Sequence, residues 1–243
     1  MTTPRLRMLG GPNGSGKSTL LELMKTQFPI SLGYVQNPDV IEQDLRHTRQ
    51  LDFTPWGLSV EPAELARFFA IHPLAAAHGI PAPPVRGNVL YLEDGGNPYL
   101  VTVLADFMRR KWLASQASFT CETVMSGPDK VDLLREARVR GYRTYLYYVC
   151  TDSPLINQGR VAARVADGGH NVPGDKIAQR YRRSLVALRE AATAVARAFL
   201  FDNSTAGHPA RLIAEYQEGH LLRVTEDLPN WYVSTLLHPL DHD

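Results

Sequence analysis

Apolar residues are concentrated in five short runs, and the segments between these runs carry apolar residues at helical spacing. Short continuous apolar runs are typical of strands that are buried on both faces of a sheet. Alternation of such strands with helices predicts an open parallel sheet of about five strands, with helices on both faces. The runs are Leu6 to Leu9, Gly33 to Gln36, Ala117 to Cys121, Thr144 to Cys150 and Ala198 to Phe201.

The segment after the first run has the pattern of a phosphate-binding loop. Residues 11–18 read GPNGSGKS, which fits G-x-x-x-x-G-K-[ST], and the residues that follow are spaced as in a helix. Glycines let backbone N–H groups turn inward around phosphates, and the start of the helix adds partial positive charge. A glycine-rich turn without a ligand is the structural alternative. The residues expected to bind ATP are Gly11, Asn13, Gly14, Ser15, Gly16, Lys17, Ser18 and Thr19.

Three side chains of this loop have distinct expected roles. Lys17 bridges the outer phosphates, and the Ser18 hydroxyl is the expected Mg²⁺ ligand, because Mg²⁺ combines a few protein oxygens with phosphate and water. Thr19 is expected to contact an inner phosphate. The loop therefore predicts ATP and Mg²⁺ as ligands.

Two carboxylates follow the ends of predicted strands, where parallel sheets bind their ligands. Asp39 lies 22 positions after Lys17 and is the candidate base for an acceptor hydroxyl. Its alternative role, compatible with the first, is to cap a helix over Val40 to Arg46. Glu122 emerges from an apolar run and needs a partner, which is either the magnesium shell or a polar substrate. A structural ion pair is the alternative.

Arginines are concentrated between residues 160 and 197. Arg160 and Arg164 project from one face if Ile156 to Val165 is helical, and Arg180 follows after a glycine-rich turn that contains His170. This arrangement suits a lid, residues 153–183, that brings guanidinium groups onto the transferred phosphate. Any single arginine of the cluster, including Arg182 and Arg183, could equally be a surface residue. His170 is expected to form hydrogen bonds rather than to bind a metal.

Two segments extend a minimal nucleotide-binding domain. Residues 52–115 are rich in proline and are expected to form an insertion with two helices, Glu61 to Ile71 and Tyr99 to Leu113, and a short hairpin near Val89 to Leu92. Residues 205–243 are expected to form a hairpin of Leu212 to Tyr216 and Leu221 to Thr225, then a short helix of Trp231 to Leu237. The whole chain, 1–243, is thus interpreted as one decorated domain.

Composition narrows the class of protein. The chain has 243 residues, of which 44% are hydrophobic and 21% charged, and its formal charge is +1. It lacks an apolar run of 18 residues, which argues against membrane insertion and favours a cytoplasmic protein. Cys121 and Cys150 lie in strand-like runs and are expected to be buried thiols rather than a disulfide or a metal site.

Several of these stretches resemble the zeta toxin family of P-loop kinases, in particular the zeta-toxin-like predicted ATPases of bacteria. The matching stretches are Gly10 to Thr19, Tyr34 to Asp39, Ser118 to Ser126, Arg164 to Tyr181 and Phe201 to Ser204. The resemblance implies an adenylate-kinase-like core, and an activity that phosphorylates a sugar hydroxyl of UDP-N-acetylglucosamine with ATP. It implies that Asp39 is the base and that Glu122 holds the substrate or the magnesium shell. It also implies that Arg164 and Arg180 flank the phosphates.

The leading hypothesis is therefore an ATP- and magnesium-dependent kinase of a small molecule, with a sugar nucleotide as the candidate acceptor and an antitoxin as a candidate protein partner. The expected catalytic residues are Lys17, Asp39, Glu122, Arg164 and Arg180, and the expected metal ligands are Ser18 and Glu122. An alternative is an ATP-switched interaction module that a protein partner controls. A nucleic-acid 5′-hydroxyl kinase would need a basic groove with stacking aromatics; the balanced charge argues against it, whereas Trp56 and Trp112 leave it open.

Overall fold

The computed structural model describes residues 3–94, 96–166 and 172–237. The chain forms two compact units. The first unit comprises the residues up to Gly33 together with those from Thr120 onward, and the second comprises Tyr34 to Phe119. The expected insertion, 52–115, falls within the second unit.

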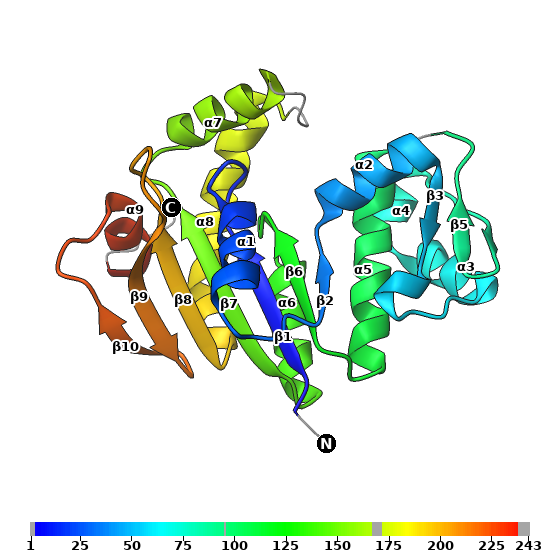
Figure 1. Cartoon of the computed structure of the whole chain (residues 1–243), viewed down its shortest axis with the longest axis horizontal. Helices are drawn as coiled ribbons and strands as arrows, with labels where there is room; N and C mark the ends of the chain where they lie inside the picture. The colour runs from blue at the N-terminus through cyan, green and yellow to red at the C-terminus, as the bar shows by residue number, and fades with distance from the viewer. Residues whose placement is uncertain (1–2, 95, 167–171, 238–243) are drawn as a thin grey trace. The chain divides into compact units, whose positions relative to one another are not determined.

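The first unit is built on a mostly parallel sheet, as the sequence predicts. Its strands lie in the order β10-β9-β8-β7-β1-β6 (Figure 1). Strands β1, β7 and β8 run parallel, whereas β9 and β10 add an antiparallel edge. The strands are β1 (Arg5–Gly10), β6 (Phe119–Thr123), β7 (Arg143–Cys150), β8 (Arg197–Asp202), β9 (Arg211–Gln217) and β10 (His220–Val224).

Helices lie on the two sides of this sheet. Helix α1 contacts β1, and α6 and α8 contact β7. In Figure 1, α1 is drawn in front of the sheet and α8 behind it. The main core lies on the side of α6 and α8, where Leu6, Met8, Leu146 and Leu200 are fully buried. The helices are α1 (Lys17–Gln27), α6 (Asp129–Val139), α7 (Pro154–Ala166), α8 (Gly174–Ala194) and the short α9 (Asn230–Tyr232).

The second unit combines helices with a small antiparallel sheet of order β3-β5-β4. Within its described residues, 34–94 and 96–119, four α-helices each begin with a proline in the first turn, where the missing N–H costs nothing. The fully buried Trp112 stacks on Tyr34 at 5.7 Å and donates to the Trp56 oxygen. The elements are β2 (Tyr34–Gln36), α2 (Pro38–Thr48), β3 (Gln50–Asp52), the 3-10 turn Thr54–Trp56, α3 (Pro62–Ile71), α4 (Pro73–His78), β4 (Val85–Arg86), β5 (Val89–Tyr91) and α5 (Pro98–Ala114).

Most predicted elements of the second unit are confirmed, with shifted ends. The hairpin covers 85–91 rather than Val89 to Leu92, because Gly87 and Asn88 both adopt positive φ and form its turn. The sequence interpretation missed α4, which lies in the section expected to be loop. The strand expected at Ala117 begins two residues later, since Gln116 has φ 55° and the Ala117 N–H still donates to α5.

The C-terminal extension is part of the main sheet. The predicted hairpin is confirmed, and its first strand, β9, pairs with β8. The expected helix of Trp231 to Leu237 consists of α9 and a π-helical turn, Val233–Leu237. Both cysteines are buried free thiols, as predicted. None of the helices in the described part of the chain has the length and apolarity needed to cross a bilayer.

Candidate phosphate-binding site

The predicted loop connects β1 to α1 and has a conformation that only glycine adopts freely. Gly11, Gly14 and Gly16 have φ of 140°, 74° and 103°. A Cβ atom on Gly11 would lie 2.1 Å from the Val149 oxygen, and one on Gly16 would lie 2.3 Å from Asn203 Nδ2. The tight packing of the loop against neighbouring strand ends therefore explains the glycines.

Three side-chain donors hold carbonyl groups of the loop. Asn157 Nδ2 donates to the Asn13 oxygen at 2.6 Å, and Asn203 Nδ2 donates to the Ser15 oxygen at 2.7 Å. Lys17 Nζ donates to the Pro12 oxygen at 2.9 Å. Across a planar peptide, the C=O of one residue and the N–H of the next point in opposite directions. The N–H groups of residues 13, 14 and 16 therefore point away from these donors, as a phosphate cradle requires.

Ser18 and Glu122 meet beside the loop. Ser18 lies in the first turn of α1, and its Oγ donates to Glu122 Oε1 at 2.9 Å and Oε2 at 3.1 Å. Glu122 lies near the end of β6 and is only 7% exposed. A hydroxyl and a carboxylate are oxygen donors of the kind that Mg²⁺ selects, so this pair fits the predicted metal. Among the described residues, no group of three His, Cys, Asp or Glu side chains offers an alternative metal site.

Asn157 is a site residue that the sequence interpretation missed. It lies in the first turn of α7 and is fully buried. Its Oδ1 accepts from Thr151 Oγ1, directly after β7, while its Nδ2 binds the loop. Its burial together with Val161, four residues later, marks one helix face. The sequence signal was an asparagine on the apolar face of a predicted helix, which is weak when seen alone.

The arginines of the predicted lid differ in position. Arg180, on α8, directs Nη1 toward Asn13 Oδ1 at 3.5 Å, the limit of a hydrogen bond. Arg164, on α7, is exposed. Within the described part of the chain, Arg160 Nη1 and Ser15 Oγ are buried atoms without a hydrogen-bond partner. The glycine-rich turn and His170 lie in 167–171, outside the described residues.

Asp39 belongs to the second unit. It lies in the first turn of α2 and is exposed. The helix cap is Asn37, whose Oδ1 accepts from the Asp39 N–H at 2.9 Å. The alternative role considered for Asp39, that of the N-cap, is therefore wrong, because the preceding asparagine fills it. The Asp39 carboxylate is left with no capping role at this helix.

The ends of β7 and β8 are joined by the C-terminal segment. Asp202 Oδ1 accepts from Trp231 Nε1 at 3.0 Å and from Ser204 Oγ at 2.6 Å. Asp152 Oδ1 accepts from the Trp231 N–H at 3.2 Å. Asn203, which binds the phosphate loop, lies between Asp202 and Ser204. The segment around Trp231 therefore fixes the strand ends that support the loop.

Buried hydroxyl and thiol groups lie at the end of β7 and on the facing side of α8. Tyr181 of α8 donates to the Thr151 oxygen at 2.6 Å, and Tyr148 contacts Ser184 Oγ at 3.0 Å. Burial raises the pKa of Cys150 to about 12 and also raises the pKa values of Tyr148 and Tyr181. All three side chains remain protonated near neutral pH, so they support the loop structurally rather than acting as bases.

Comparison with solved structures places the fold. A chain of the AvrRxo1-ORF1:-ORF2 complex with ATP matches 91% of this chain and 60% of its own length, at 14% identity and a TM-score of 0.55. A chain of the same complex with sulphate ions matches 91% of this chain and 61% of its own length, at 15% identity and a TM-score of 0.52. The P-loop α/β fold that the sequence resemblance implied is therefore confirmed. A structure from the PezAT toxin–antitoxin system of Streptococcus pneumoniae matches 84% of this chain and 69% of its own length, with 14% identity and a TM-score of 0.48.

Similarity in sequence is more limited. No family model matches the chain. A Haemophilus influenzae protein, described as an uncharacterized protein, is 32% identical over 63 residues, which is 26% of this chain and 45% of that protein. The chain thus spans about three fifths of the AvrRxo1 chains and less than half of the Haemophilus protein.

Proposed function

We propose that this protein is an ATP- and Mg²⁺-dependent kinase that transfers the γ-phosphate to a hydroxyl group of a small molecule. The observation that carries this proposal is the contact of Ser18 with both carboxylate oxygens of Glu122. This contact lies next to a loop whose carbonyl groups accept hydrogen bonds from the side chains of Asn157 and Asn203. The backbone N–H groups of the loop, which can bind phosphate, therefore lie next to the oxygen atoms of Ser18 and Glu122, which can bind Mg²⁺. The shared fold of a chain solved with ATP supports the same proposal.

The loop would bind the phosphates of ATP through its backbone N–H groups and through Lys17. Lys17 is 8% exposed, so its ammonium group would act on phosphate charge in a partly desolvated site. Ser15 Oγ, within the loop, is a buried polar atom without a protein partner in the described structure, and a phosphate oxygen would satisfy it. Thr19, in the first turn of α1, is the remaining candidate ligand of an inner phosphate.

Ser18 and Glu122 would hold the magnesium ion, either directly or through water. When bound, Mg²⁺ neutralises charge on the transferred phosphate and on the leaving group. Arg164 and Arg180 are the candidate guanidinium groups for the γ-phosphate. Because Arg180 already points toward Asn13, a modest rotation of its side chain would bring it to a phosphate in the loop.

Asp39 would accept the proton of the acceptor hydroxyl. The hydroxyl oxygen forms the new bond to phosphorus, the bond from phosphorus to the bridging oxygen of ADP breaks, and the released proton goes to the carboxylate. Asp39 is exposed and is not consumed as a helix cap, which suits a base that must meet a substrate. UDP-N-acetylglucosamine or another sugar nucleotide is the proposed acceptor, by resemblance to the zeta toxin family.

The test is an incubation of the purified protein with Mg²⁺, γ-labelled ATP and a panel of sugar nucleotides, nucleosides and aminoglycoside-like alcohols. Mass spectrometry would detect an added phosphate. Asp39→Asn should abolish transfer and preserve ATP binding, whereas Asp44→Asn, an exposed carboxylate on the same helix, should leave transfer unchanged. Transfer by Asp39→Asn at the wild-type rate would show that the base lies elsewhere.

A second candidate function is an ATP-switched module that a protein partner controls. The AvrRxo1-ORF1:-ORF2 structures, which share this fold, are complexes of two gene products, and an antitoxin-like protein is the candidate partner here. The direct bond from Asn157 to the loop favours such a switch, since a change in the loop would move α7. Tight ATP binding without a phosphorylated small molecule, and with turnover only in the presence of a protein partner, would favour this function.

A further inference from the structure

One face of the main sheet is only partly covered. Residues that alternate along β7 and β8 separate into two sets, and one set, which includes Leu146, Tyr148 and Leu200, is fully buried beneath α6 and α8. The other set, which includes Tyr145, Tyr147, Arg197 and Phe199, is partly exposed. In the described part of the first unit, Figure 1 shows α1 on this side, in front of β1.

Arginines and aromatic rings alternate across this face, which we call the arginine–aromatic face. Strand register places Arg7, Tyr145 and Arg197 in one row, and Tyr147 and Phe199 in the next. The Arg7 guanidinium lies 5.5 Å from the centre of the Tyr145 ring, and that of Arg143 lies 5.6 Å from the same ring. Arg197 lies 5.4 Å from the Phe199 ring, which stacks on Tyr147 at 5.1 Å. The guanidinium groups are thus held in place by rings.

Positive charge on this face exceeds negative charge. The strands contribute Arg7, Arg143, Arg197 and Arg223, and among the described residues of these rows the acidic side chain is Glu215, which pairs with Arg197. Arg7 is 3% exposed, and both its Nη1 and the Nε of Arg197 are buried without a hydrogen-bond partner. Burial also lowers the pKa of Arg7. Arg143 and Arg223 are exposed, so theirs are the guanidinium groups that the carboxylates of a docked partner can reach.

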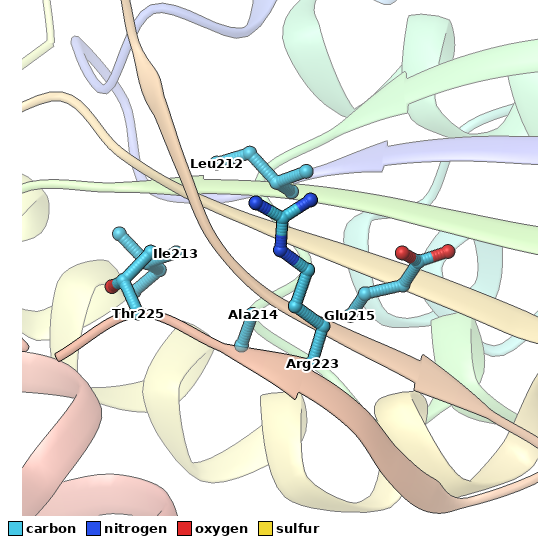
Figure 2. A pocket seen from close by; sticks show the side chains of 6 residues that line it. All are labelled: Leu212, Ile213, Ala214, Glu215, Arg223 and Thr225. Carbon is cyan, nitrogen blue, oxygen red and sulfur yellow. The ribbon is translucent and has the colours of Figure 1, made fainter.

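The face continues onto the C-terminal hairpin. Phe201 pairs with Leu212 and Phe199 pairs with Glu215, so these side chains share one side of the sheet. Arg223 pairs with Glu215 on β10. Figure 2 shows a small hollow at this edge, where the Arg223 side chain extends toward Leu212. The hollow extends the arginine–aromatic face over five neighbouring strands.

We propose that the arginine–aromatic face binds an acidic segment of a partner protein. Arginine stacked on a ring keeps its N–H edges available for carboxylates, and its planar fork suits bidentate contacts. Single-stranded nucleic acid is the less favoured occupant, because base stacking needs free rings. Here Tyr145 is covered by two guanidinium groups, and Phe199 by Arg197 and Tyr147.

Fluorescence anisotropy can test this proposal without any assay of phosphotransfer. The probe is a labelled peptide rich in Glu and Asp, about 15 residues long, which can cross four or five strands spaced about 4.8 Å apart. A matched peptide with Gln and Asn at the acidic positions measures non-electrostatic binding. The variant is Arg143→Glu, an exposed position on the face, with Arg143→Ala as a milder change. Arg189→Glu, an exposed position on α8, is the matched control.

The expected result is that the acidic peptide binds and the matched Gln and Asn peptide does not. The affinity for the acidic peptide should fall as the salt concentration rises. Arg143→Glu should weaken binding by about tenfold and Arg143→Ala by about threefold, while Arg189→Glu should change it by less than about twofold. Equal losses in Arg143→Glu and Arg189→Glu, or no binding by the wild type, would overturn the proposal. Tighter binding of an oligothymidylate, or a dimer that Arg143→Glu dissociates, would assign the face to nucleic acid or to a second copy.

Discussion

The side-chain amide of Asn157 donates a hydrogen bond of 2.6 Å to the main-chain oxygen of Asn13. This contact joins α7, which lies in the segment predicted to be a lid, to the phosphate loop. Because Asn157 is fully buried, the amide and the loop carbonyl lack an equivalent bond to water. The position of the loop therefore depends on a residue far from it in sequence.

Asn157→Ala should reduce both stability and ATP affinity. The variant leaves a buried carbonyl and the Thr151 hydroxyl without their partner, which costs about 1–3 kcal/mol and lowers the melting temperature by several degrees. Thermal unfolding with and without ATP measures both effects. Leu155→Ala, which changes a 72% exposed residue of the same helix, is the control and should have little effect. A wild-type ATP affinity in Asn157→Ala would disprove the link to the loop.

Gly11→Ala should prevent the loop from forming its observed shape. The added Cβ would approach the Val149 oxygen to 2.1 Å, and φ of 140° is unfavourable for alanine. We expect a large loss of stability, above about 3 kcal/mol, and no measurable ATP binding. Gly159→Ala is the matched control, because that glycine lies inside α7 with open space around it. It should stabilise the protein by about 0.5–1 kcal/mol, and a similar loss in both variants would contradict this account.

Glu122→Gln should separate metal use from ATP binding. The substitution retains an oxygen acceptor for Ser18 and removes the negative charge. If Glu122 supports the ion, the Mg²⁺ concentration for half-maximal activity should rise by about tenfold or more. Binding of ATP without metal should change little. Glu136→Gln, on the surface pair with Arg140, should leave the Mg²⁺ dependence unaltered. An unchanged Mg²⁺ dependence in Glu122→Gln would favour a purely structural role.

The phosphate loop and the presence of a largely parallel sheet could be predicted because their signals are local. A fixed spacing of glycines before Lys17 and short apolar runs identify the loop and the sheet without any tertiary information. Helix α4 was missed since it has only six residues, the first of which is Pro73, and carries little periodicity. The pairing of β9 with β8 was also missed, because local patterns show a hairpin and not the sheet edge to which it binds.

The residues of the site outside the loop were found only in part by the same reasoning. Glu122 was identified because a carboxylate ends an apolar run, and the structure brings it to Ser18 across 104 positions of sequence. Asn203 belongs to the stretch Phe201 to Ser204 that the sequence marked, but its bond to the Ser15 oxygen was not predicted. Asn157 was not marked, because sequence spacing carries no signal for a side-chain bond to a main-chain oxygen of the loop. Asp39 remains a prediction, since its role depends on the substrate that it meets.

Cys150 should make the protein less stable as the pH rises above about 9. Burial raises the pKa of the folded thiol to about 12, from an ordinary value of 9.0. Below pH 9 both the folded and unfolded forms hold the proton, so the thiol adds no pH dependence. Above pH 9 the unfolded chain releases the proton and the folded chain keeps it, which favours unfolding by up to about 1.4 kcal/mol per pH unit.

Urea unfolding of the wild type and Cys150→Ala at pH 8, 9 and 10 would measure this difference. The slope should be smaller in the variant, because the buried tyrosines, which have raised pKa values in the folded protein, contribute mainly above their ordinary pKa of 10.0. Equal slopes would show that the thiol ionises as easily in the folded protein as in the unfolded chain.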